Sequence, residues 1–459
     1  MIITLTVDQA IPRIEIQPDF VQVITDVQLR KVKDESFWIN IANQTINIHV
    51  TQTGPTTTIF NCVESQQFKF TRLDSYIFQL VLKDHEALKS LLIRVPKQHL
   101  IIEHMNSDLT AISTTTTTIS TTGEHEVTIV LGDSHGTIDK FTMPGLTTLG
   151  STLKPNLSIS PAHLLDITNL QIFPSPSSTV LLSTSLDFTT KIWSLLDGTN
   201  PRVFKGVQLE RITSLVLIGH GRNFITGSTD GSAVLWECGS GEKLWVGRRV
   251  KNGKDAVLDL CVTDESVSKI SKTKNNSDEI QDKFFECDDK TLYVAHQSGT
   301  ISIWDLGTRC FLAEFNTLSS ISSVTVSKTK IITGSSDGGL IKCFDRLTHK
   351  LLWETQLFNC IDESLSDDGI HKATGGEITK LRYAELNHHH SKDKVEVVIG
   401  LSSDSNCIFS LNVKNGELYE WFSGFSDGRP LDFDFEVTKI EEHDCDVYVC
   451  GKAGYLLQY

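Results

Sequence analysis

A repeated pattern along the chain constrains the fold more than any other sequence feature. Three segments can be superposed on one another: 182–193, 225–236 and 293–304. Each has a short apolar strand, a turn of small polar residues and an alternating strand that ends in tryptophan. The turn residue stands six positions before that tryptophan, at Asp187, Asp230 and Ser298. The chain is therefore predicted to consist of repeated β-units that stack against their neighbours.

Weaker copies extend the pattern in both directions, at 131–141, 332–344, 399–411 and 449–459. A small polar turn between two short strands, the second ending in a large residue, is typical of WD repeats. We count seven units, and seven units close naturally into a ring. The sequence thus predicts an all-β fold: a seven-bladed WD40 β-propeller.

The tryptophans and turn residues are predicted to be structural. We expect each tryptophan to pack between blades, and each aspartate and hydroxyl to satisfy turn and strand hydrogen bonds. His163 is predicted to complete one such network with Ser183, Asp187 and Trp193. Because every unit repeats this geometry, a catalytic serine, histidine and aspartate set is not favoured.

The end of the chain predicts how the ring closes. A full unit finishes with an outer strand such as 243–246, whereas the last unit stops at Tyr459. An open sheet edge invites aggregation, so we expect a strand over 98–102 to complete the last blade. The predicted domains are a small β-rich N-terminal domain over 1–95 and the propeller over 96–459.

Composition limits the class of partner. The net charge is −15 for 459 residues, whereas nucleic-acid binding relies on clustered Lys and Arg. Nucleic acid is therefore not an expected partner, and an acidic surface favours a basic one. Apolar runs such as Tyr76–Leu82 are too short for a membrane span. The start of the chain lacks a signal-peptide pattern, and ten scattered cysteines fit a reducing compartment, the cytoplasm or nucleus.

No motif predicts an active site. The histidines at 388–390 lie in a polar loop, whereas metal sites usually draw ligands from several elements. Residues 219–223 resemble the start of a phosphate loop but precede a strand, so no helix N-terminus is available for an anion. We expect no catalytic residues, no metal and no cofactor, and hence a protein that is not an enzyme.

Two acidic loops supply the candidate partner-binding residues. In a propeller, the loops from each outer strand to the next inner strand share one face with the turns that carry Asp187 and Asp230, and we call this the first face. The loops 361–369 and 425–436 are predicted to be neighbours there. Their candidate contacts are Asp362, Glu363, Asp367, Asp368, Asp427, Asp432, Asp434 and Glu436, with Phe433 and Phe435 as anchors. Aromatic anchors beside charge are typical of protein interfaces, and the alternative is that both loops are merely solvated.

A family resemblance adds to this pattern. Residues 190–202, Gly221–Asn223 and 230–241 resemble the proteasomal ATPase-associated factor family, WD-repeat chaperones for assembly of the 26S proteasome regulatory particle. Residues 34–41 are similar to the opening segment of that family. The chain departs from the pattern at 206–209, where a Gly-His pair is expected. One inter-strand hydrogen-bond network is therefore expected to be weakened.

The resemblance implies a non-catalytic assembly chaperone. It would bind the C-terminal domain of one proteasomal AAA ATPase subunit, through a basic surface, during assembly of the regulatory-particle base, with other assembly chaperones as further partners. One alternative is a WD40 substrate receptor or scaffold in a ubiquitin ligase or other multiprotein complex, with an adaptor-binding segment within 1–95. Another is a ribosome-biogenesis propeller that contacts RNA, which the charge disfavours.

Overall fold

A computed structural model describes residues 9–41, 44–54, 58–62, 67–83, 88–102, 107–118, 125–144, 152–174, 178–249, 254–263, 283–357, 376–387, 394–425, 429–436 and 446–459. Strands form most of this part of the chain, which confirms the predicted all-β class. Its helical elements are the α-helix α1 (Phe20–Gln28) and the 3-10 turn η1 (Lys452–Gly454). Within the residues described, no helix has the length and hydropathy that a membrane crossing requires.

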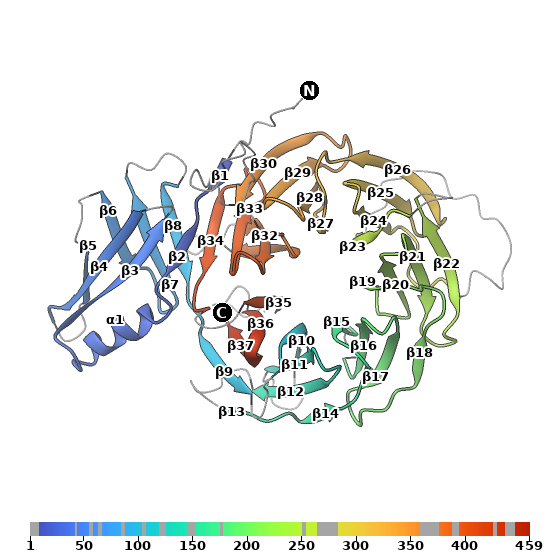
Figure 1. The fold of residues 1–459 in the computed structure, drawn as a ribbon, viewed down its shortest axis with the longest axis horizontal. Helices are drawn as coiled ribbons and strands as arrows, with labels where there is room; N and C mark the ends of the chain where they lie inside the picture. Colours follow the sequence, from blue (N-terminus) through green and yellow to red (C-terminus); the bar gives the residue numbers. More distant parts are fainter. Residues whose placement is uncertain are drawn as a thin grey trace, which may run out of the picture.

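The described residues form eight sheets, of which seven stand around a central axis, and we call these seven blades 1 to 7 in chain order (Figure 1). Blades 1 to 4 are antiparallel sheets of four strands. Blade 1 contains β10 (Leu109–Thr118), β11 (His125–Asp133), β12 (Ile138–Pro144) and β14 (Leu157–Ile159). Blade 2 contains β15 (Ile167–Ile172), β16 (Val180–Ser185), β17 (Thr190–Ser194) and β18 (Arg202–Phe204). Blade 3 contains β19 (Ile212–Ile218), β20 (Asn223–Ser228), β21 (Ser232–Glu237) and β22 (Lys243–Arg248). Blade 4 contains β23 (Val257–Thr263), β24 (Thr291–His296), β25 (Thr300–Asp305) and β26 (Cys310–Asn316).

Blades 5 to 7 have the same antiparallel core of four strands and carry added strands at their outer edges. Blade 5 contains β27 (Ser323–Val326), β28 (Lys330–Gly334), β29 (Leu340–Asp345) and β30 (Leu351–Leu357). Blade 6 contains β31 (Lys380–Asn387), β32 (Lys394–Ser402), β33 (Cys407–Asn412) and β34 (Leu418–Phe422). Blade 7 contains β35 (Pro430–Glu436), β36 (Asp446–Gly451), β37 (Tyr455–Gln458) and β9 (Gln98–Ile102).

The two ends of the ring meet at blade 7. The strand β9 pairs antiparallel with β37, with Leu100 opposite Leu456, and occupies the place in which the sequence analysis expects a strand. The innermost strand β35 contacts β10 of blade 1. No free edge is left at β37, because its hydrogen-bonding groups pair with a strand from before the first blade.

Burial patterns follow the position of each strand. Every residue of β20 and β21 is buried, because these middle strands of blade 3 are covered on both faces. In β4 (Gln44–Gln52) the buried residues Ile46, Ile48 and Val50 alternate with partly exposed ones. This alternation marks a strand with one face on a core and one towards solvent.

Residues before blade 1 form a β-rich unit beside the ring (Figure 1). One sheet contains β2 (Ile14–Ile16), β3 (Asp34–Ile41), β4 and β5 (Thr58–Cys62). The helix α1 packs against β3 and β4. Its buried residues recur at helical spacing, at Phe20, Val23, Ile24 and Val27, so a single stripe faces the core.

Hydrogen bonds join this unit to the propeller. The strands β6 (Phe68–Arg72), β7 (Ile77–Leu82) and β8 (Ser90–Arg94) extend blade 6, with β8 parallel to β34. The strand β1 (Gln9–Ile11) is parallel to β30, and β13 (Thr152–Leu153) is parallel to β9. The predicted boundary between residues 95 and 96 therefore does not separate two independent sheets, because a continuous sheet crosses it.

Candidate functional site

The turns of the first face are fixed by hydrogen bonds that repeat from blade to blade. In blade 2, His163 Nε2 lies 2.7 Å from Ser183 Oγ, and His163 Nδ1 lies 3.0 Å from Asp187 Oδ2. The indole N–H of Trp193 donates to the same Ser183 oxygen over 2.8 Å. The network predicted for these four residues is confirmed.

This network is structural rather than nucleophilic. Burial lowers the pKa of the His163 imidazole below its usual value, which favours the neutral ring at pH 7. A neutral ring protonated on Nδ1 would donate to Asp187 and accept from the Ser183 hydroxyl. Ser183 has no exposed surface, so a substrate cannot reach its oxygen.

Blade 3 keeps a network without a histidine. The side-chain amide of Gln208 donates to the carbonyl oxygens of Thr226 (3.1 Å) and Ser232 (3.2 Å). The Thr226 hydroxyl donates to Gln208 Oε1 over 2.7 Å and accepts from the indole of Trp236 over 2.9 Å. The sequence at 206–209 predicts a weakened network here. The structure shows instead that Gln208 takes the histidine's place, because its amide both donates and accepts.

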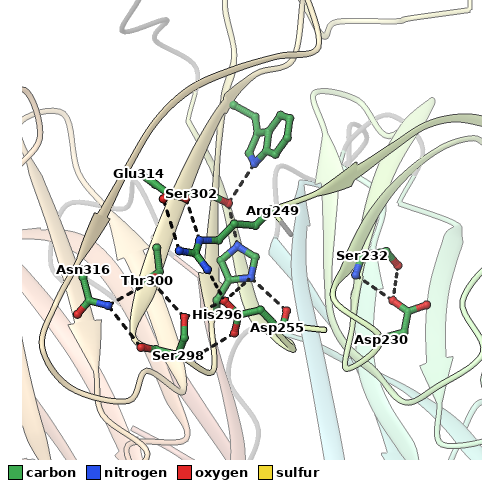
Figure 2. Close-up of polar contacts among 11 residues, drawn as sticks. Asp230, Ser232, Arg249, Asp255, His296, Ser298, Thr300, Ser302, Glu314 and Asn316 are labelled. Carbon is green, nitrogen blue, oxygen red and sulfur yellow. Dashed lines mark hydrogen bonds and ion pairs between the residues drawn. The ribbon is translucent and has the colours of Figure 1, made fainter. Parts of the chain in front are cut away.

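Blade 4 has a similar hydrogen-bond network, but its histidine and its carboxylate come from different positions than in blade 2 (Figure 2). Its histidine, His296, is on β24 and lies 2.8 Å from Ser302 Oγ. The turn residue is Ser298, where blades 2 and 3 have an aspartate, so another residue supplies the carboxylate. The N–H and hydroxyl of Ser298 donate over 3.1 and 2.7 Å to Asp255, which comes from the loop before blade 4.

The same carboxylate anchors a cation between two blades. Arg249 follows β22 and donates to Asp255 Oδ2 over 3.0 Å and to Glu314 Oε2 over 2.8 Å (Figure 2). Glu314 belongs to β26, so these contacts tie the end of blade 3 to the outer strand of blade 4. One guanidinium thus bridges two carboxylates, and these contacts hold the loop that carries Asp255 in place.

Large apolar side chains project from the fixed turns of the first face. Their exposed fractions are 81% for Leu164, 49% for Leu165, 45% for Phe188, 73% for Leu209 and 69% for Leu318. Leu164 adjoins the turn that carries Phe188, since its N–H donates to Asp187 Oδ2 over 3.2 Å. Adjacent exposed apolar side chains are characteristic of interaction sites, and Leu164 and the Phe188 turn are adjacent in this way.

Two of these side chains stand on left-handed backbone. Phe188 has φ 64° and Leu318 has φ 60°, a conformation that is unfavourable by about 1–2 kcal/mol for a residue with a Cβ. Blades 3 and 4 carry Gly231 and Gly299 at the position equivalent to Phe188, with φ 82° and 80°. Phe188 was not among the predicted site residues, although it is a large residue at a position where the superposed repeats of blades 3 and 4 have glycine.

Part of the predicted acidic surface lies outside the described residues. This applies to Asp362, Glu363, Asp367, Asp368 and Asp427, and to the predicted loop 361–369 as a whole. The structure describes the backbone of Glu436 but not its side chain. The histidine cluster at 388–390 also lies outside the described residues, among which no group of three or more His, Cys, Asp or Glu side chains could hold a metal.

The assignment of 425–436 to a loop is wrong for residues 430–436, which form β35. Phe433 is fully buried and Phe435 packs against the same core. Asp432 accepts the N–H of Ile112 over 3.0 Å and pairs with the ammonium group of Lys380 at 2.5 Å. These side chains hold blade 7 within the ring, and a partner would have to displace such contacts to reach them.

Asp434 has a similar position. Its carboxylate accepts the N–H of Thr114 over 2.8 Å and the Thr114 hydroxyl over 3.2 Å, and burial raises its pKa. It therefore joins blade 7 to blade 1. The structure brings together Asp432, Asp434, Phe433 and Phe435, but between blades rather than on a partner-facing rim.

Comparisons with known proteins match part of the chain. The family model "WD domain, G-beta repeat" matches residues 154–194 and 198–237. The curated 26S proteasome regulatory subunit RPN14 of Saccharomyces cerevisiae is 29% identical over 237 residues, which are 51% of this chain and 50% of that protein. The chain thus spans about half the length of the curated relative that it matches. The crystal structure of the computationally designed Ika8 protein covers 79% of this chain and 99% of that one, with 18% identity and a TM-score of 0.48. Residues 154–194 and 198–237 thus match the WD-repeat model, and about half of the chain is similar to a proteasome regulatory subunit.

Proposed function

We propose that this protein is a non-catalytic assembly chaperone of the proteasome regulatory particle, built on a seven-bladed propeller with an attached N-terminal unit. It would bind the C-terminal domain of one ATPase subunit and act in the cytoplasm or nucleus. The partial similarity to RPN14 supports the link to the proteasome. The observation that carries the binding role is the set of exposed apolar side chains on the first face.

Rigid presentation favours binding by these residues. Phe188 and Leu209 occupy loops that the networks of His163 and Gln208 hold in place. A partner that covers them loses little conformational entropy in the chaperone, because their loops are already ordered. Left-handed backbone at Phe188 and Leu318 is a local strain of the kind found at functional sites.

The electrostatic contribution is expected to come from 361–369. Its four carboxylates remain the predicted contacts for a basic domain surface, with the apolar side chains of blades 2, 3 and 5 supplying the buried part of the interface. Charged contacts of this kind mainly accelerate encounter and weaken as salt increases. Asp432 and Asp434 are not needed for this proposal.

The test compares two leucines of equal exposure on opposite faces. Leu209 is 73% exposed on the first face, and Leu347 is 74% exposed in the turn between β29 and β30 on the opposite face. Tagged full-length protein, wild type or carrying Leu209→Asp or Leu347→Asp, is incubated with lysate that contains 26S proteasomes. Bound chains are identified by mass spectrometry, and binding is then measured with the purified C-terminal domain of each proteasomal ATPase subunit.

We expect wild type and Leu347→Asp to capture one ATPase subunit without the proteolytic particle, and Leu209→Asp to lose that capture. All three proteins should have the same melting temperature, since both leucines are exposed. Equal capture by both variants would remove the first face from the proposal. Recovery of ubiquitin-ligase components or ribosomal precursors, with no ATPase subunit, would refute the chaperone function in favour of a scaffold.

A further inference from the structure

A pocket of about 340 Å³ opens between blades 2 and 3, on the face opposite the first face. Its apolar part comes from blade 2, where Phe173, Val180, Ile192 and Pro201 line it. Its polar part comes from the ends of β18 and β21 and from the turns that follow β19 and β21. This volume is at the small end of ligand pockets, which span about 300–1,000 Å³, and suits one large side chain rather than a folded element.

Two of the segments that carry the family resemblance, Gly221–Asn223 and 230–241, form one wall of this pocket. The first contributes Gly221 and Arg222, and the second contributes Glu237, Cys238 and Gly239. Gly221 has φ 91°, and a Cβ there would lie 2.4 Å from Cδ1 of Phe173. Glycine is therefore required at this position, because the backbone packs directly against the aromatic floor.

The carboxylates around the rim are already engaged. Glu237 accepts the backbone N–H groups of Gly239, over 2.8 Å, and of Ser240. Glu286 accepts the N–H of His220 and contacts its Nδ1, both over 2.6 Å. Glu242 pairs with the ammonium group of Lys283 at 2.5 Å.

The two arginines of the lining are in a different situation. Arg202 donates to the carbonyl oxygens of Gly239 and Ser240, which are neutral acceptors. The guanidinium of Arg222 lies 3.4 Å from the ring centre of Phe285. The charge of Arg222 also acts on the carboxylate of Glu237 in the same lining, which therefore holds two guanidinium groups and one carboxylate. An apolar floor beside two such cations matches a ligand that has an apolar group next to an anionic one.

We propose that this pocket docks an acidic peptide segment of a partner protein. One aromatic or aliphatic side chain of the segment enters between Phe173 and Ile192, and an adjacent carboxylate pairs with Arg222 and Arg202. Guanidinium groups suit this role because they bind carboxylates through two parallel hydrogen bonds. The site is on the face opposite Phe188 and Leu209, so this inference does not depend on the proposed function. It would let the propeller hold a second polypeptide while its first face is occupied.

The test uses fluorescence anisotropy with the full chain and a labelled peptide, Ser-Asp-Phe-Glu-Ser. Two control peptides remove one feature each: Ser-Asn-Phe-Gln-Ser lacks the charge and Ser-Asp-Gly-Glu-Ser lacks the aromatic group. We expect the first peptide to bind with a Kd below about 1 mM. Each control should bind at least about tenfold more weakly, since a charge-assisted contact is worth about a factor of ten or more.

Arginine variants locate the site. Arg222→Ala should weaken binding of the acidic peptide at least about tenfold. Arg309→Ala is the matched control, because Arg309 also stacks on a phenylalanine, Phe284 at 4.1 Å, in a turn on the same face. Arg222→Glu should reverse the preference and favour Ser-Lys-Phe-Lys-Ser. These arginines are at the surface, and equal melting temperatures establish that each variant is folded.

Three outcomes would overturn the inference. No binding of the acidic peptide at millimolar concentration would exclude the site. Equal binding of the uncharged peptide would remove the role of the arginines. An equal loss in Arg222→Ala and Arg309→Ala would show a general charge effect rather than a pocket. None of these results depends on whether the first face captures a proteasomal ATPase subunit.

Discussion

The ion pair between Arg94 and Glu420 connects the N-terminal unit to blade 6, and its removal should loosen that connection. Arg94 Nε donates to Glu420 Oε2 over 3.1 Å, and Arg94 Nη2 donates to Glu420 Oε1 over 2.9 Å. The two side chains are 10% and 1% exposed. Because water screens this bidentate pair so little, each charge depends on the other for its stabilisation.

The expected magnitude follows from that burial. Glu420→Leu leaves the Arg94 charge buried with its bidentate partner gone, which destabilises a protein by about 3–5 kcal/mol. Arg94→Leu should have an effect of similar size, because the Glu420 carboxylate then stays buried after the Arg94 guanidinium is removed. The double variant, Arg94→Leu with Glu420→Leu, removes both charges, and its stability should lie within about 1–2 kcal/mol of the wild type.

Urea unfolding monitored by tryptophan fluorescence gives the three free energies, and hydrogen–deuterium exchange locates the effect. In Glu420→Leu, amides of β6 to β8 should exchange faster while those of blade 3 keep their protection, because Arg94 is the last residue of β8. Additive effects of the two single substitutions would refute the reasoning, because they would mean that the charges do not interact. If Glu420→Leu lowers the free energy of unfolding by less than about 1 kcal/mol, the ion pair is effectively hydrated.

Two further predictions concern the first face. Burial lowers the pKa values of His163 and His296, so the unfolded chain takes up protons below about pH 6.5 that the folded chain does not. Stability should therefore fall as pH decreases from about 6.5, and His163→Gln should make this fall less steep in urea unfolding from pH 7 to 5. An unchanged pH dependence would show that His163 does not titrate on unfolding. Phe188→Gly should change the free energy of unfolding by less than about 1 kcal/mol, because relief of the left-handed backbone offsets the lost contacts, yet weaken capture of an ATPase subunit. A large loss of stability would mean that Phe188 is held for folding instead.

The repeat made much of the ring predictable. A strand, a polar turn and a strand ending in tryptophan recur because each blade needs the same local hydrogen bonds, and the set around His163 was predictable residue by residue. The substitute in blade 3 was not, since a glutamine stands there in place of the histidine that marks the network in blade 2. Single-sequence patterns show which group is missing but not which side chain fills its place.

The acidic site was less predictable, for a physical reason. The alternation of Asp432, Phe433, Asp434 and Phe435 suits a loop with aromatic anchors and equally suits a strand with one buried face. Local sequence cannot separate these structures, because the deciding partners are Ile112, Thr114 and Lys380 on other blades. The pairing of β8 with β34 is likewise hidden from local sequence, because it joins residues more than three hundred positions apart.

Long-range pairing explains how the fold supports contacts on both faces. The added strands β1, β8 and β13 cover the outer edges of blades 5, 6 and 7. Two of these strands, β1 and β8, come from the N-terminal segment and support blades 5 and 6, while the apolar turns and the blade 2–3 pocket lie mainly in the simpler four-stranded blades. Binding at those blades requires little rearrangement of the joined half, because the closing hydrogen bonds at β9 and β37 are remote from them. A partner on the first face and a peptide in the pocket would therefore contact opposite ends of the same blades. Coupling between them would pass through the middle strands of these blades, β16 and β17 in blade 2 and β20 and β21 in blade 3, of which β20 and β21 are buried along their whole length.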